Sequence, residues 1–221
     1  MMVATENGTI TVADLVERLG GVPGERIFLT PAPGKATEDD LIRLLEGPNK
    51  VICELIDGVL VEKALATPEG IMAVFVGRKI GNFADEEDLG LVGDSGSPFR
   101  FRLGLVRIPD VSFTSWVRIG ADEFPSDPIA NLIPDLAVEV LSQANTPAEI
   151  ELKLDHYFEA GVRLVWIIDP KRQKARAYTS RRRSQEIGID GDLLGGRVLP
   201  GFRLPLKDVI HSTRRRKRKP R

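Results

Sequence analysis

The segment between residues 134 and 168 constrains the fold most. It contains a strand-like run (134–141), a helical stretch and a second run (162–168) that is apolar on both faces. A strand with two apolar faces lies inside a sheet that other elements cover on both sides. Two strands joined through one helix are expected to run parallel, with a right-handed crossover. The sequence therefore predicts a mixed α/β fold with a central sheet flanked by helices.

Both ends of the connecting helix are marked in the sequence. Thr146 is followed by a proline and, three positions on, by Glu149, which is the pattern of a capping box. Gly161 is typical of a C-terminal stop. A helical projection places Lys153 within the apolar stripe and His156 on the opposite, outer side. Lys153 is therefore expected to face the sheet.

The rest of the chain predicts further short elements. They are a helix from Thr11 to about Leu19, a Pro/Gly linker (30–36), a helix capped by Thr37, a hairpin turning at Asp57-Gly58, a helix over 70–84, strands over 100–107, 108–116 and 175–179, a hairpin over 186–204 and a terminal element over 206–210. We expect three parts: an N-terminal extension (1–36), one domain (37–210) and a disordered basic tail (211–221).

Composition excludes several classes of function. Cys53 is the sole cysteine, so no intrachain disulfide forms, and two histidines with one cysteine speak against a zinc site. No G-x-S-x-G motif supports a serine hydrolase. No apolar run is long enough to cross a bilayer and no secretory signal opens the chain, so we expect no membrane partner and a cytoplasmic location.

Two carboxylates and a lysine stand where a purely apolar core would not place them. Glu139 interrupts the most apolar part of its strand, and an unpaired buried carboxylate is costly. Asp110 opens a strand after Pro109, and Lys153 faces the sheet. Carboxylate oxygens suit Mg²⁺ or Mn²⁺, which would activate a water and neutralise a phosphate, with Lys153 positioning or deprotonating that water. The alternative is a structural Glu139–Lys153 ion pair, with Asp110 only ending a turn.

Four stretches carry a resemblance to a known family: CELIDGVLVEK (53–63), RIPDVSF (107–113), PDLAVEVLSQAN (134–145) and KLDHYFEAGVRLVWIIDP (153–170). In this order they resemble the Uma2 family, formerly DUF820, of restriction-endonuclease-like proteins in the PD-(D/E)XK nuclease superfamily. The resemblance covers about residues 37–210. It implies a restriction-endonuclease-like core, that is, a mixed β-sheet flanked by helices, here with an extra N-terminal helix and β-hairpins.

The resemblance also implies roles for individual residues. Asp110 matches the acid of the proline-aspartate motif and Glu139 the second acid, so both are expected to hold the metal ion. The lysine that the superfamily usually carries two positions after the second acid is replaced here by Leu141, and Lys153 matches the displaced lysine on the following helix. Glu54 matches a further acidic position. All four are candidate catalytic residues.

The function implied is a metal-dependent endonuclease, using Mg²⁺ or Mn²⁺, that hydrolyses phosphodiester bonds in DNA. The alternative is a catalytically degenerate nuclease-fold module that binds nucleic acid or a protein partner. A homodimer is expected, because two-fold dimers are the commonest oligomers and duplex DNA is pseudo-symmetric.

Two basic clusters are candidate nucleic-acid contacts. The last eight residues hold seven basic ones, so the rest of the chain has 24 basic against 32 acidic residues and a formal charge of −8. Such a tail either binds phosphates or only aids solubility. A basic turn in the C-terminal half either contacts phosphate or is solvated. The candidates are Arg181, Arg182, Arg183, Arg214, Arg215, Arg216, Lys217, Arg218 and Lys219.

Overall fold

The computed structural model describes residues 11–64, 66–120, 123–124 and 126–214. Within these ranges the larger sheet has six strands in the order β10-β9-β8-β7-β6-β3. They span Gly90–Asp94 (β3), Val111–Ser115 (β6), Leu136–Val140 (β7), Leu164–Asp169 (β8), Lys174–Ser180 (β9) and Arg183–Ile187 (β10). β7 and β8 are parallel, whereas β6 runs antiparallel to β7. The predicted mixed sheet is confirmed.

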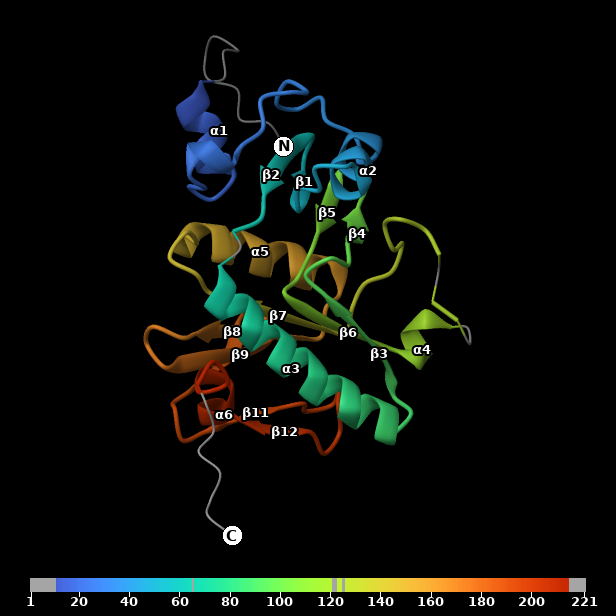
Figure 1. Ribbon diagram of the computed structural model, residues 1–221, viewed down its shortest axis with the longest axis vertical. Coiled ribbons are helices and arrows are strands. Elements are labelled where there is room, and N and C mark those ends of the chain that lie inside the picture. Colours follow the sequence, from blue (N-terminus) through green and yellow to red (C-terminus); the bar gives the residue numbers. More distant parts are fainter. Residues whose placement is uncertain (1–10, 65, 121–122, 125, 215–221) are drawn as a thin grey trace.

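Helices cover both faces of this sheet, as the apolar pattern of β8 requires. Trp166 and its alternate neighbours pack toward α3 (Thr67–Glu86) and α6 (Leu206–Ile210). Val165 and Ile167 pack toward α5 (Pro147–Ala160) and α1 (Val12–Arg18). Because side chains of a strand alternate between faces, one apolar strand contributes to both cores. Figure 1 shows α3 lying across the sheet.

A smaller sheet lies at the top of the view in Figure 1, next to α2 (Glu38–Glu46). Its strands follow the order β2-β1-β5-β4. They span Cys53–Ile56 (β1), Val59–Glu62 (β2), Phe99–Arg102 (β4) and Leu105–Arg107 (β5). The predicted hairpin turn is present, with φ of 49° at Asp57 and 77° at Gly58. Positive φ at both turn residues matches the twist of the two strands.

Four predicted elements differ in detail. The hairpin predicted over 186–204 is shifted, because residues 186 and 187 belong to β10, which pairs with β9, and the later pair of strands spans Asp192–Leu194 and Arg203–Pro205. Residues 100–107 form two strands rather than one, because Gly104 adopts a φ of 74° and reverses the chain. The strand predicted over 108–116 ends at Ser115, whose side chain caps the short helix α4 (Trp116–Ile119). The helix predicted from residue 70 begins at Thr67, with a proline in its first turn.

The remaining elements complete the edges of the fold. A short 3₁₀ helix, η1 (Gly24–Arg26), follows α1, and a two-stranded sheet of β11 (Asp192–Leu194) and β12 (Arg203–Pro205) leads into α6. Gly20 lies so close to the start of α5 that a Cβ there would come within 2.7 Å of the Glu149 backbone nitrogen. The N-terminal segment thus packs on the main body. Of the helices in the described ranges, none is long and apolar enough to span a membrane.

Candidate active site

The four predicted site residues converge at one end of the larger sheet. Asp110 directly precedes β6, and Glu139 lies in β7 beside it, because Val111 pairs with Val138 in an antiparallel register. Lys153 reaches this end from α5, with its Nζ 2.9 Å from Glu139 Oε2. Glu54 approaches from β1, with Oε1 3.8 Å from Lys153 Nζ. Four separate elements therefore supply one cluster.

Of the three acids Glu54, Asp110 and Glu139, Asp110 has the side chain that is most accessible to solvent. Its Oδ2 accepts a 2.7 Å hydrogen bond from the backbone nitrogen of Val140, and its Oδ1 lies 2.8 Å from Lys63 Nζ. Its side chain is 13% exposed, against 2% for Glu54 and 5% for Glu139. Solvent therefore reaches the cluster on the Asp110 side.

Two cations in the cluster are additions to the residues expected from sequence. Arg107, at the end of β5, places Nη1 2.7 Å from Glu54 Oε2 and is almost fully buried. Lys63, directly after β2, donates to the Ile108 carbonyl at 2.5 Å as well as pairing with Asp110. Both lie inside the motif stretches. In the sequence, each of them could have been recognised as a basic residue at the end of an apolar strand, within a few positions of an acid in the same motif.

The outward position predicted for His156 is wrong. Its side chain is buried, and its Nδ1 accepts from Arg107 Nε at 3.2 Å. The helical projection placed it correctly relative to the larger sheet, but the smaller sheet covers this side of α5. Burial, reinforced by the charges of Arg107 and Arg102, lowers the pKa of His156 to about 4. The imidazole is therefore neutral at neutral pH.

Tyr157 completes the contacts of Glu139. Its hydroxyl donates to Glu139 Oε1, and its ring packs against Phe101 with the centroids 5.3 Å apart. Burial raises the pKa of Tyr157 well above its usual value, and the charge of Glu139 adds to this. The phenol is therefore a fixed proton donor to the carboxylate.

The acids of the cluster have opposite electrostatic surroundings. Burial alone would raise the pKa of Glu54, but the charges of Lys153, Arg107 and Lys63 lower it to about 2. Burial raises the pKa of Glu139 by more than the charge of Lys153 lowers it, and the negative charge of Asp110 raises it further. Glu54 is thus held in its ionised form, whereas the ionised form of Glu139 would gain more from an additional positive charge than that of Glu54.

Lys153 is held as a cation. Burial alone would lower its pKa, but Glu139 and Glu54 raise it above the usual value. An ammonium so paired donates hydrogen bonds and stabilises negative charge. Formally, three carboxylates (Glu54, Asp110, Glu139) face three cations (Lys63, Arg107, Lys153).

The donor set fits a hard divalent cation of the kind that keeps much of its water. Among the described residues, no group of three or more His, Cys, Asp or Glu side chains is arranged as a metal site. Mg²⁺ needs only one or two carboxylates and takes its other ligands from water and phosphate oxygens. Asp110 and Glu139 supply two such carboxylates, one of them within reach of solvent. Their roles as ligands remain a prediction.

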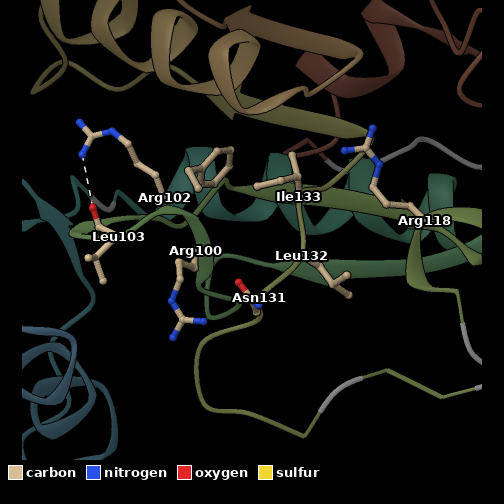
Figure 2. Close-up of a pocket in the computed structure, with 8 residues that line it drawn as sticks. Arg100, Arg102, Leu103, Arg118, Asn131, Leu132 and Ile133 are labelled. Carbon is tan, nitrogen blue, oxygen red and sulfur yellow. Dashed lines mark hydrogen bonds between the residues drawn. The ribbon is translucent and has the colours of Figure 1, made fainter.

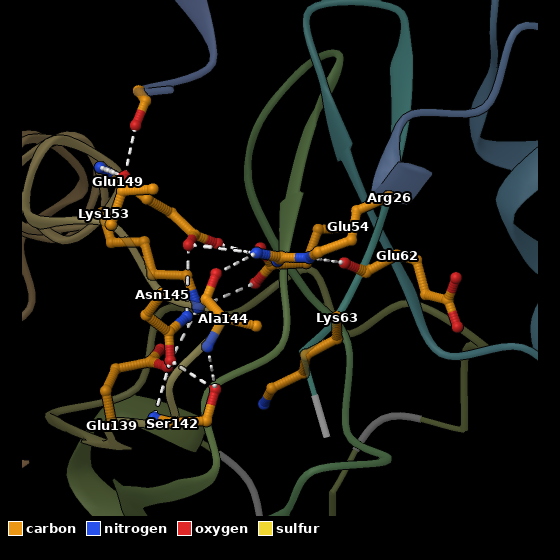
Figure 3. Close-up of polar contacts among 12 residues, drawn as sticks. Arg26, Glu54, Glu62, Lys63, Glu139, Ser142, Ala144, Asn145, Glu149 and Lys153 are labelled. Carbon is orange, nitrogen blue, oxygen red and sulfur yellow. Dashed lines mark hydrogen bonds and ion pairs between the residues drawn. The ribbon is translucent and has the colours of Figure 1, made fainter. Parts of the chain in front are cut away.

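The loop that leads from Glu139 into α5 is fixed by a second polar network, shown in Figure 3. Thr146 accepts from the Glu149 backbone nitrogen at 3.0 Å, as a cap should. The Glu149 carboxylate, however, binds Arg26 Nη2 at 2.8 Å instead of the cap backbone, so the predicted reciprocal capping box is wrong in this half. Asn145 also donates to Glu149 and accepts from Ser142. The N-terminal segment therefore sets the start of the helix that carries Lys153.

The candidate nucleic-acid contacts are not gathered at this cluster. Arg181 pairs with Asp155 and with Glu151 Oε2 at 2.5 Å, on the outer side of α5. Arg183 and Arg214 are exposed. Arg182 is exposed too, in the turn between β9 and β10. The tail candidates Arg215, Arg216, Lys217, Arg218 and Lys219 lie outside the described residues. Contact with nucleic acid remains a prediction for all of them.

A cavity of about 450 Å³ lies away from the cluster (Figure 2). Three arginines line it, but each is paired with an acid: Arg100 with Glu38, Arg102 with Asp57 and Arg118 with Asp135. None of the four predicted site residues lines it. The positive charge at this cavity is therefore largely neutralised within the protein.

The comparisons with known proteins agree with the fold. One solved structure similar to the chain is described as a "putative nuclease belonging to DUF820" from Anabaena variabilis ATCC 29413. The match has a TM-score of 0.65 and 19% identity, and covers 72% of this chain and 90% of the other. No curated protein matches the chain. The sequence model of the Uma2 family, described as "Putative restriction endonuclease", matches residues 39–207, which hold all four converging residues, and the chain belongs to this family.

Proposed function

We propose that the protein is a metal-dependent nuclease that hydrolyses phosphodiester bonds in DNA. The observation that carries the proposal is the convergence of Glu54 and Glu139 on Lys153, with Asp110 beside Glu139 at one solvent-reachable end of the sheet. Family membership and the nuclease-like fold support nuclease chemistry in general. Mg²⁺ or Mn²⁺ dependence, DNA as the substrate and the residue roles are the additional claims.

Asp110 and Glu139 would hold the ion, which supplies Lewis-acid activation of a water and of the scissile phosphate. Tyr157 fixes Glu139 by donating to Oε1, so that Oε2 points toward Lys153. Lys153, held as a cation, orients the attacking water and stabilises the negative charge that develops on the phosphate. Glu54 holds Lys153 and Arg107 in place and acts through them.

The test is a cleavage assay on plasmid and single-stranded DNA with Mg²⁺ or Mn²⁺, comparing wild type with Glu139→Gln. We expect the variant to lose at least about 10³-fold in rate, because it removes a metal ligand. Glu186→Gln is the matched control, since Glu186 is an exposed acid that pairs only with Lys174 and Arg176 among the contacts described. Equal cleavage by wild type and Glu139→Gln would contradict the proposal.

One observation favours the alternative of a non-cleaving module. The three carboxylates are fully matched by Lys63, Lys153 and Arg107, which is the state of a buried structural network. Such a module would bind DNA or a protein without requiring a divalent ion. DNA binding by gel shift with no cleavage in either metal would support this second function.

We also propose a homodimer, cytoplasmic localisation and DNA contact by the tail, as the sequence indicates. Light scattering measures the dimer directly. Removal of residues 214–221 is expected to weaken DNA binding at low salt while leaving cut positions unchanged. Identical affinity and salt dependence after truncation would contradict DNA contact by the tail.

A further inference from the structure

Lys63 is the cation that the proposed mechanism does not use. Its side chain is buried and extends from the residue that follows β2 (Figure 3). Its ammonium lies 2.8 Å from Asp110 Oδ1 and donates to the Ile108 carbonyl at 2.5 Å. Its positive charge also lowers the pKa of Glu54. Lys63 therefore interacts with the acids of the site and is not part of the solvent-exposed surface.

The position of Lys63 differs from that of Lys153. Lys153 lies between Glu54 and Glu139, the two acids that are buried most deeply. Lys63 lies instead on Asp110, whose side chain is the one in contact with solvent. A cation entering from solvent therefore first meets Asp110, which Lys63 already neutralises.

The two oxygens of Asp110 have different freedom to bind an ion. Oδ2 accepts from the Val140 backbone nitrogen at 2.7 Å, a bond that helps hold Asp110 against β7. Oδ1 has the Lys63 ammonium as its partner. An ammonium and a divalent ion on the same oxygen would lie only about 4 Å apart, where their charges repel. Lys63 in this position therefore opposes metal binding through Oδ1.

We infer that Lys63 is a tethered competitor of the divalent ion: it neutralises Asp110 in the metal-free protein, is displaced from Oδ1 when the ion binds, and thereby sets the affinity of the site. The inference rests on the metal site of the proposed function and deepens it. The flexible four-carbon stem of lysine permits such a movement without a change in the backbone.

The test is a Mn²⁺ titration by calorimetry on metal-free wild type and Lys63→Met. We expect the variant to bind Mn²⁺ at least about tenfold more tightly, because methionine keeps most of the volume but carries no charge. Lys174→Met is the matched control, since Lys174 is an exposed lysine paired with Glu186, and its affinity should equal that of wild type. If wild type binds Mn²⁺ and Lys63→Met binds it equally tightly or more weakly, the inference is overturned and the proposed metal site is not. No Mn²⁺ binding by either protein overturns the proposed metal site and the inference with it.

A second measurement does not depend on the folding of a variant. In wild type with ¹⁵N-labelled lysine, the buried ammonium groups of Lys63 and Lys153 should give slowly exchanging Nζ signals. Saturating Mg²⁺ should move one of these two signals into fast exchange with water and leave the other. Two signals unchanged at saturating Mg²⁺ would overturn the displacement.

Discussion

The two ends of strands β6 and β7 each bury a carboxylate, but they use it differently. At the far end, Asp135 is fully buried and lies 2.7 Å from both Arg118 Nε and Arg163 Nη2, while it accepts from the Ser115 backbone nitrogen at 2.8 Å. At the near end, three acids and three cations share one cluster. One acid with two arginines is a closed structural contact. Three acids matched by three cations form a network that, under the proposed function, takes up a divalent ion.

The largest effect should separate the two ends by activity. Lys153→Met removes the cation shared by Glu139 and Glu54 and should reduce cleavage at least about 10³-fold. Arg163→Met removes a cation from Asp135 at the other end and should change the rate by less than about twofold, because Arg118 and the Ser115 nitrogen remain. Rates are measured under single-turnover conditions at saturating Mg²⁺. A large loss in Arg163→Met would show that the two ends are coupled.

The second comparison concerns stability. Asp135→Asn removes a fully buried anion and should lower the free energy of unfolding by about 2 kcal/mol, less than for a fully buried pair because Arg118 and Arg163 reach solvent. Urea denaturation measures this change. Mn²⁺ affinity should stay at the wild-type value, because Asp135 lies at the opposite end of the strand from Glu139. A changed Mn²⁺ affinity in a folded variant would contradict the division of roles.

The third effect is a pH dependence that belongs to the cluster end. The pKa of His156 is about 4 in the folded protein against about 6.5 when unfolded, so the unfolded chain binds more protons between these values. Stability should be fully present above pH 6.5 and should fall by up to about 3 kcal/mol as the pH drops toward 4. Glu54, with a pKa of about 2, should extend the loss below pH 4.5. In a folded His156→Gln variant, the denaturation midpoint should depend less on pH between pH 4 and 7 than in wild type. An equally steep dependence would show that another group causes the loss of stability.

The smallest effect concerns Arg181. Its pairs with Asp155 and Glu151 are partly exposed, so Arg181→Ala should change the free energy of unfolding by less than about 1 kcal/mol. If Arg181 also contacts a phosphate, the salt dependence of DNA binding should become shallower by about 0.9 in log–log slope. An unchanged slope would leave Arg181 as a surface ion pair only.

Local signals were sufficient for most of the fold. The strands around residues 134–168, the hairpin at Asp57-Gly58 and the helix caps at Thr11 and Thr37 follow from side-chain period and turn chemistry, and all are present. The four residues that converge were identified by an acid or lysine placed among apolar neighbours and by family motifs. These features depend on residues close together in the chain.

What the sequence did not show depends on packing between distant segments. The outward placement of His156 failed because no projection of α5 reveals that a second sheet covers its other side. The capping box failed because Glu149 meets Arg26, which lies 123 positions earlier. The ion pair of Lys63 with Asp110 likewise arises only when the smaller sheet lies against the end of the larger one, and that of Arg107 with Glu54 only when β5 pairs with β1.

The contact between Arg26 and Glu149 has a consequence for choosing where to cut the gene. The family match begins at residue 39, whereas Arg26 binds Glu149, the Ala144 carbonyl and the Glu62 carbonyl. An expression clone limited to residues 39–207 would lack Arg26. The Glu149 carboxylate would then lose its guanidinium partner in the first turn of the helix that carries Lys153. We therefore expect the smallest autonomous folding unit to extend further toward the N-terminus than the family boundary, so a clone for crystallisation or assay should include Arg26.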